Sequence, residues 1–345
     1  MLEIRRARAR RSMDLDDRRR CIEIVNRRQF LTGSAAASLA IGLDPLAFAA
    51  RLGAPGVALV TADLESHVVV LDLGMATTLA RIKTAPGPRS IESVPGRAAV
   101  VAHTEHGLVS ILDAALRTVR EDDSFGTPRY TAVHPAQPIA YVTDSARQEV
   151  VAFAVDRGEA LWRTAVPGPA RHIAISPDGA TIWTALGTAA ERLAVLDSTS
   201  PRRPKLVRAI APPFLAHDVV FSPDGRNVWV TSGSQRQIAI YRAGSARPTR
   251  IVAAEAPPQH VAFARDKAFV ASGEDGTVRR HRLDGALVRE ARVPVGSYNV
   301  AFGSGYLVTP SLGQGTVSLL YRDGRVRWIR QIARAAHDAC ILIGP

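Results

Sequence analysis

A pair of adjacent polar residues recurs along this chain, and most of its members can bind ions or move protons. Each pair precedes a short turn signal, at intervals of about 40 residues, with apolar or small residues between the pair and the turn. The first positions hold Arg89, Arg129, Arg171, His217, Gln259, Tyr298 and His337. The second positions hold Ser90, Tyr130, His172, Asp218, His260, Asn299 and Asp338. Such side chains can hold an anion, coordinate a metal or act as acid and base.

Three of the histidines occupy these positions in consecutive repeats. His172, His217 and His260 supply imidazole nitrogens, and Asp218 adds a carboxylate, which together suit zinc or a similar divalent ion. No short-range ligand spacing, such as paired cysteines, accompanies them. The alternative is that these histidines bond backbone carbonyls where repeats meet. We expect that the fold requires no cofactor. The cofactor that these residues would fit is a divalent metal ion.

Three arginines occupy the first position of consecutive repeats and indicate an anion site. Arg89, Arg129 and Arg171 carry planar guanidinium groups, which suit bidentate capture of a carboxylate or phosphate. Ion pairing between neighbouring repeats is the alternative interpretation. Polar residues in other loops are expected on the same face: Asp63, Glu65, His103, Glu105, His106, Asp144, Glu274 and Asp275.

Turns between short β-strands must position these residues. Ser-Pro-Asp-Gly occurs at residues 176–179 and 222–225, and each copy lies between apolar segments that include Trp183 and Trp229. Proline presets φ, aspartate bonds nearby backbone and glycine accepts positive φ, so the chain reverses into an antiparallel hairpin. Trp162 and Trp328 fall in the outermost strands, and all four tryptophans are expected to pack in the core.

The repeat predicts an all-β fold over residues 54–345. Each unit reads as four short strands, and seven turn markers predict a seven-bladed β-propeller of four-stranded antiparallel blades. Residues 58–82 supply only three strands, whereas residues 337–341 copy an inner strand with no blade after it. We therefore expect the C-terminal strand to complete the first blade and close the ring.

The first 49 residues have a different composition and are expected to form an export signal. Arginines precede a mild apolar run, and Asn26-Arg27-Arg28-Gln29-Phe30-Leu31 resembles a twin-arginine translocation signal. The sequence thus predicts a periplasmic protein without a membrane span after signal removal. Cys340 is then the only cysteine left, expected as a buried thiol.

The formal net charge of +12 is partly carried by this leader. No basic run with interleaved aromatic residues follows residue 50, so nucleic-acid binding is not expected. We expect a monomer whose partner is a small anionic ligand or another protein.

Residues 139–144, Ile-Ala-Tyr-Val-Thr-Asp, together with the Ser-Pro-Asp-Gly turns, resemble the YVTN-type repeats of bacterial seven-bladed propellers. That group includes exported proteins, surface proteins and relatives of propeller lactonases. From the rim residues we expect a binding or scaffold protein that receives a small anionic ligand or a partner loop at the histidine- and arginine-rich mouth of the channel. The resemblance implies the alternative, a lactonase-like and metal-assisted hydrolase that uses the same rim. Propellers that bind a d-type haem also place histidines at such a mouth, but they resemble this chain less.

Overall fold

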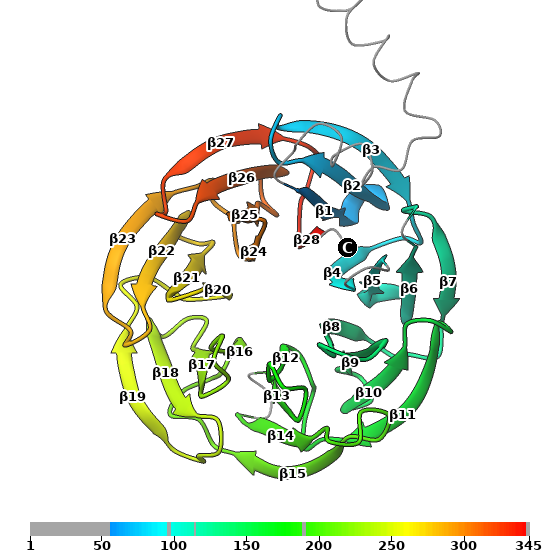
Figure 1. The fold of residues 1–345 in the computed structure, drawn as a ribbon, viewed down its shortest axis with the longest axis vertical. Coiled ribbons are helices and arrows are strands. Elements are labelled where there is room, and N and C mark those ends of the chain that lie inside the picture. Colours follow the sequence, from blue (N-terminus) through cyan, green and yellow to red (C-terminus); the bar gives the residue numbers. More distant parts are fainter. Residues whose placement is uncertain (1–55, 95–97, 114, 188–190, 343–345) are drawn as a thin grey trace, which may run out of the picture. The chain divides into compact units, whose positions relative to one another are not determined.

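Short apolar strands joined by tight turns assemble into seven separate sheets arranged around a central channel (Figure 1). The computed structural model describes residues 56–94, 98–113, 115–187 and 191–342. Every sheet has four antiparallel strands in sequence order from the channel outwards, except that the last strand of the chain joins the first three. The predicted all-β, seven-bladed propeller is therefore confirmed.

The blades are numbered here along the chain, beginning with the one formed by β28, β1, β2 and β3. Their inner strands are β28 (Ala339–Leu342), β4 (Pro88–Val94), β8 (Pro128–Val133), β12 (Ile173–Ile175), β16 (Val219–Phe221), β20 (Val261–Ala264) and β24 (Ala301–Gly303). The second strands are β1 (Val57–Ala62), β5 (Ala98–His103), β9 (Ile139–Asp144), β13 (Thr181–Ala185), β17 (Asn227–Thr231), β21 (Lys267–Ser272) and β25 (Tyr306–Pro310). The third strands are β2 (His67–Asp72), β6 (Leu108–Leu112), β10 (Glu149–Ala154), β14 (Leu193–Asp197), β18 (Gln237–Arg242), β22 (Thr277–Arg282) and β26 (Thr316–Tyr321). The outer strands are β3 (Thr77–Lys83), β7 (Thr118–Asp122), β11 (Glu159–Ala165), β15 (Lys205–Ile210), β19 (Pro248–Ala253), β23 (Leu287–Arg292) and β27 (Val326–Gln331).

The Ser-Pro-Asp-Gly turns form the hairpins between inner and second strands. In the blade of β16 and β17, the Ser222 hydroxyl donates to Asp224 at 2.6 Å, and the amide of Arg226 donates to the same carboxylate at 3.1 Å. Gly225 has a φ of 70°, in the left-handed region that glycine tolerates best. The turn thus forms by the local chemistry expected from its sequence.

The core lies between neighbouring blades. The second and third strands are buried along nearly their whole length, as in β9 and β10, whereas the outer strands are largely exposed. Trp183 and Tyr241 belong to adjacent blades and pack with their ring centroids 5.4 Å apart. Each sheet therefore buries both faces against its neighbours, which a single sheet could not do.

The ends of the ring meet in the first blade. Strand β28 pairs antiparallel with β1 over four residue pairs, from Val57 opposite Leu342 to Val60 opposite Ala339. Backbone hydrogen bonds extend this pairing, because His337 donates to the carbonyl of Thr61 and Thr61 donates to that of Asp338. The predicted closure is confirmed, and Figure 1 shows β28 beside β1 at the channel.

The predicted export signal, residues 1–49, lies outside the described residues, as does residue 54, where the propeller was expected to begin. The described helices are two 3₁₀ turns, Asp63–Glu65 and Thr104–His106. Neither they nor any other described segment forms an apolar helix of membrane-spanning length.

Candidate functional site

The recurring polar pairs gather at the mouth of the channel where the inner strands begin. Five of the seven pairs precede their inner strands, but Arg89 and Arg129 lie within β4 and β8. These two strands start one residue before the arginine, at Pro88 and Pro128. Both strands pair irregularly with the second strand of their blade at this point. The inner-strand beginnings therefore differ between blades although their sequence positions are equivalent.

Three histidines from the fourth, fifth and sixth blades meet at this mouth. One nitrogen each of His172, His217 and His260 lies within 4.8 Å of the other two. The ring centroids are 4.5 Å apart for His172 and His217, 4.6 Å for His172 and His260, and 5.5 Å for His217 and His260. These residues form the histidine cluster.

Burial keeps the histidine cluster in its neutral form. It lowers the pKa of His217 to about 4, with a smaller contribution from the charge of Arg171. Burial also lowers the pKa values of His172 and His260 well below the ordinary value, and the neighbouring histidines add to the effect. Neutral imidazoles can accept a proton or donate a lone pair to a metal.

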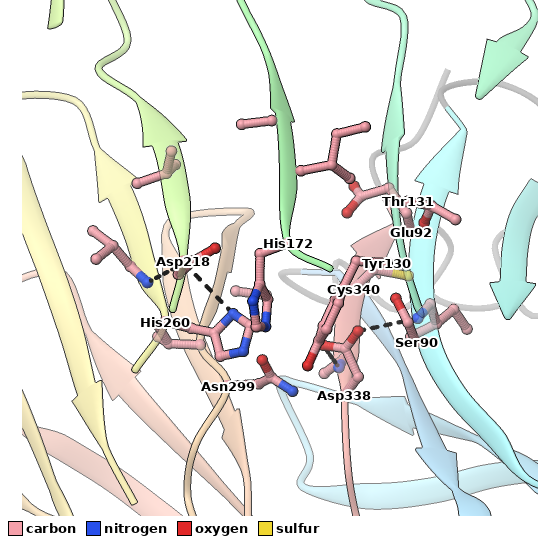
Figure 2. A pocket seen from close by; sticks show the side chains of 18 of the residues that line it. Ser90, Glu92, Tyr130, Thr131, His172, Asp218, His260, Asn299, Asp338 and Cys340 are labelled. Carbon is pink, nitrogen blue, oxygen red and sulfur yellow. Dashed lines mark hydrogen bonds and ion pairs between the residues drawn. The ribbon is translucent and has the colours of Figure 1, made fainter. Parts of the chain in front are cut away.

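Asp218 orients one of these rings and also joins two blades. Its carboxylate accepts the amide protons of Val219 at 2.9 Å and of Val261, in the next blade, at 3.1 Å. The same carboxylate lies 3.5 Å from Nδ1 of His260 (Figure 2). Burial raises the pKa of Asp218 to about 7. Asp218 thus fixes both the inner strand of the sixth blade and the direction of its histidine.

Asp338 repeats this arrangement across the ring closure. It accepts the amide protons of Ala339 at 2.9 Å and of Ile91, in the second blade, at 3.1 Å. His337, next to it, lies outside the histidine cluster, with Nδ1 3.5 Å from Asp63. The Asn299 amide donates to the carbonyl of His337 at 2.8 Å. The structure thus gives Asp338 and Asn299 contacts that hold blades together.

The charges of Arg89 and Arg171, from the second and fourth blades, act on Arg129 of the third blade. Burial lowers the pKa of Arg129, and the charges of Arg171 and Arg89 lower it further. None of the three forms an ion pair within 4.0 Å among the residues that the structure describes. Arg89, Arg129 and Arg171 form the arginine cluster, and interblade ion pairing does not account for it.

The two tyrosines at the mouth have different surroundings. Tyr130 stacks against His172, with 4.0 Å between ring centroids, and lies 5.4 Å from His260. Tyr298 covers Gly273, where an added Cβ would lie 2.4 Å from Cδ1 of the tyrosine ring. Tyr130 therefore adjoins the histidine cluster, whereas Tyr298 packs on a backbone that only glycine allows.

Among the polar loop residues expected on this face, some are buried with structural partners and others are exposed. His103 is fully buried, with Nδ1 3.0 Å from the carbonyl of Pro86 and Nε2 2.8 Å from the Ser110 hydroxyl. Asp144 is also buried and accepts the amide protons of Gly126 and Thr127. Both have structural partners, whereas Glu105 and His106 are exposed at the rim.

The channel holds a cavity of about 350 Å³ that begins at this mouth. Polar residues of the recurring pairs, among them His172, Asp218 and Asp338, line it together with apolar residues of the inner strands, and Glu92 and Cys340 also face it (Figure 2). Burial and the charge of Asp338 raise the pKa of Glu92 to about 8, and burial raises that of Cys340 well above its ordinary value. Glu92 is not among the residues expected from the sequence, although a carboxylate between Ile91 and Ser93 in an inner strand is a visible signal.

No family model matches this chain, and no curated protein matches its sequence. Solved structures match its fold. A functionally unknown protein from Desulfotomaculum acetoxidans has a TM-score of 0.74 at 14% identity, covering 84% of this chain and 100% of the other. Kuenenia stuttgartiensis hydrazine synthase has a TM-score of 0.58 at 21% identity, covering 70% and 79%. Dihydro-heme d1 dehydrogenase NirN in complex with DHE has a TM-score of 0.60 at 16% identity, covering 81% and 64%. At these identities the likeness shows the propeller fold alone.

Proposed function

We propose that this protein binds a small anion at the channel mouth, through Arg89, Arg129 and Arg171. The ligand is a carboxylate or phosphate compound, or an acidic loop of a partner protein. The observation that carries the proposal is the arginine cluster, in which the charges of Arg89 and Arg171 act on Arg129 and no carboxylate forms an ion pair with any of the three among the described residues.

Mutual repulsion within the arginine cluster would be relieved by an anion. The Nε atoms of Arg129 and Arg171 are buried and have no hydrogen-bond partner among the described residues. Buried donors of this kind normally find an acceptor. A carboxylate or phosphate oxygen supplies that acceptor and neutralises the local positive charge.

The first test is calorimetric titration of the purified, chelator-treated protein with inorganic phosphate and with citrate as probes. Arg129→Ala removes one charged donor from the centre of the cluster. A hydrogen bond to a charged group contributes about 1.5–3 kcal/mol, so we expect the Kd to rise about 10- to 100-fold. Arg242→Ala is the matched control, because Arg242 is exposed at the far end of β18 and should leave the Kd unchanged.

Absence of binding of either probe, or an equal loss of affinity in both variants, would contradict the anion site.

A lactone probe in the same titrations tests the alternative function, hydrolysis of a lactone. The 3.5 Å approach of Asp218 to His260 is the observation that favours a lactonase-like hydrolase, because a carboxylate can orient an imidazole that activates water. Conversion of the lactone to its hydroxy acid, rather than binding alone, would support the hydrolase.

We also propose that the protein is exported to the periplasm by the twin-arginine route and acts there as a monomer. The support is the motif Asn26-Arg27-Arg28-Gln29-Phe30-Leu31 before an apolar run and the resemblance to YVTN-type exported propellers. Replacing both Arg27 and Arg28 by lysine should retain the protein in the cytoplasm. Cell fractionation measures this, and periplasmic recovery unchanged by the double replacement would exclude the route.

A further inference from the structure

The three residues of the histidine cluster come from loops that lie far apart in the sequence. His172 precedes β12, His217 precedes β16 and His260 precedes β20, so each ring comes from a different blade. Their donor atoms nevertheless lie within 4.8 Å of one another. Three imidazoles arranged in this way match the ligand set of open zinc sites, which use three protein ligands and leave a fourth position free.

Hydrogen bonding does not account for the central ring of this cluster. His172 is 2% exposed, and neither ring nitrogen has a well-formed hydrogen bond among the described residues, although the backbone of His217 lies near enough to act on the His172 pKa. Two other buried histidines of the same chain behave differently, since His103 bonds a carbonyl and a hydroxyl, and His281 bonds the carbonyl of Gly285 at 2.9 Å. The alternative predicted from sequence, histidines that bond backbone carbonyls, therefore fits His103 and His281 but leaves His172 unexplained.

Asp218 supplies the outer contact that metal-binding histidines usually have. A ligating imidazole commonly donates its second N–H to a carboxylate, which fixes its tautomer and direction. The Asp218 carboxylate lies 3.5 Å from Nδ1 of His260 and is itself held by the amides of Val219 and Val261. This leaves Nε2 of His260 as the nitrogen available to an ion.

We propose that His172, His217 and His260 bind a divalent transition-metal ion, with zinc as the ion that fits these ligands best. Zinc–nitrogen bonds of about 2.0–2.1 Å require the nitrogens to approach one another more closely than 4.8 Å, so metal binding requires the side chains to rotate towards the ion. Asp218 acts as a positioning residue through His260. The fourth metal position is open to an anion.

The identity of this fourth ligand rests on the proposed anion-binding function. Arg171 directly precedes His172, so a cation at the histidine cluster would lie in a positive environment. An anion that contacts both the metal and the arginine cluster offsets this repulsion. Metal and anion should therefore each raise the affinity for the other by the same factor.

The test is titration of the chelator-treated, untagged protein with Co²⁺, followed by visible absorption, since cobalt in a tetrahedral nitrogen site gives an intense d–d band. We expect one Co²⁺ per chain, displaced by one Zn²⁺. His172→Ala and His260→Ala should abolish the band, and Asp218→Asn should weaken metal binding about 10- to 100-fold. His106→Ala is the control, because this exposed histidine lies on the same rim outside the cluster, and it should leave binding intact.

Circular dichroism establishes that each variant is folded, and His172→Gln replaces His172→Ala if the smaller side chain unfolds the ring. Absence of stoichiometric cobalt binding, or binding that survives in folded His172 and His260 variants, would overturn the proposal. Metal binding is measured in the absence of phosphate and citrate, and anion binding is measured on the metal-free protein. Failure of the metal site and failure of the anion site can therefore be told apart. If the protein binds both Co²⁺ and phosphate, phosphate should tighten Co²⁺ binding in the native protein, and this effect should be smaller in Arg129→Ala. A Co²⁺ affinity that phosphate leaves unchanged would overturn the anion as fourth ligand.

Discussion

Glu92 shows how the channel changes the chemistry of a single residue. Its carboxyl group faces the channel cavity, which polar and apolar side chains line together, near Asp338 and Cys340. Burial and the charge of Asp338 raise its pKa to about 8, so the group holds its proton at neutral pH. The closed ring therefore contains a carboxylic acid where the unfolded chain has a carboxylate.

This difference predicts how stability depends on pH. Between the ordinary pKa of 4.5 and about 8, the folded protein binds a proton that the unfolded chain has released, so stability falls as pH rises through this window. Glu92→Gln removes the ionisation. Thermal melts should show its Tm rising relative to native protein between pH 5 and pH 9, by about 2 °C for each kcal/mol of relieved cost.

Glu105→Gln is the control for this comparison, because Glu105 is exposed at the rim. It should shift Tm equally at all pH values. A Glu92→Gln profile parallel to that of the native protein would show that Glu92 ionises alike in both states.

Residue types alone could not separate ligand candidates from structural residues. His172 and Asp338 occupy equivalent second positions, but the ring nitrogens of His172 have no well-formed hydrogen bond among the described residues, while Asp338 bonds the backbone of the next blade. Trp162 was wrongly expected in the core; it is 43% exposed and has the guanidinium of Arg203 5.1 Å from its ring. Side-chain direction and partners decide these outcomes, and neither is encoded in the spacing of the repeat.

Among the elements, strand β28 pairs with β1 over only a few residues, but its side chains are buried. It makes four residue pairs with β1, and its Ile341 is 4% exposed. Ile341 also packs so closely on Gly303 of β24 that a Cβ there would lie 2.8 Å from the isoleucine Cβ. Strand β28 thus completes the first blade by hydrogen bonds to β1 and contacts the last blade through Ile341.

Truncation of Ile341 tests the importance of this strand. Ile341→Ala removes buried methyl groups and leaves a cavity at the junction, so we expect the free energy of unfolding to fall by about 2–5 kcal/mol. Ile329→Ala makes the same change on outer strand β27, where the side chain is 39% exposed, and should alter stability by about 0.5 kcal/mol or less. Urea denaturation measures both, and equal losses would contradict a dominant role for β28.

Turn chemistry made the strands predictable, but the beginnings of the inner strands were less so. Ser-Pro-Asp-Gly fixes where β16 ends because Asp224 and Gly225 act within the turn itself. At the opposite end, pairing depends on how the loop leaves the previous blade, and β4 starts at Pro88 whereas β12 starts only at Ile173. Local residues specify the first boundary, and tertiary contacts specify the second.

For the whole molecule, the period of the repeat predicted the number of blades and their closure, because each sheet must bury both faces. It also placed the polar pairs at one mouth. It did not predict that histidines of three consecutive blades would meet while His337 would contact Asp63 instead. The ring brings equivalent positions near one another, and the side chains of each blade determine which of them touch.

The late position of Asp338 and β28 in the chain has a consequence for biosynthesis. A ribosome delivers six complete blades and three strands of the first blade before it delivers the residues that pair with β1 and hold the amide of Ile91. Until β28 has been synthesised, β1 remains an open edge that other nascent chains can join. Chains that end before Asp338 and β28 should therefore aggregate readily and have an incomplete channel mouth, because only a chain that contains β28 can pair the edge of β1 within itself.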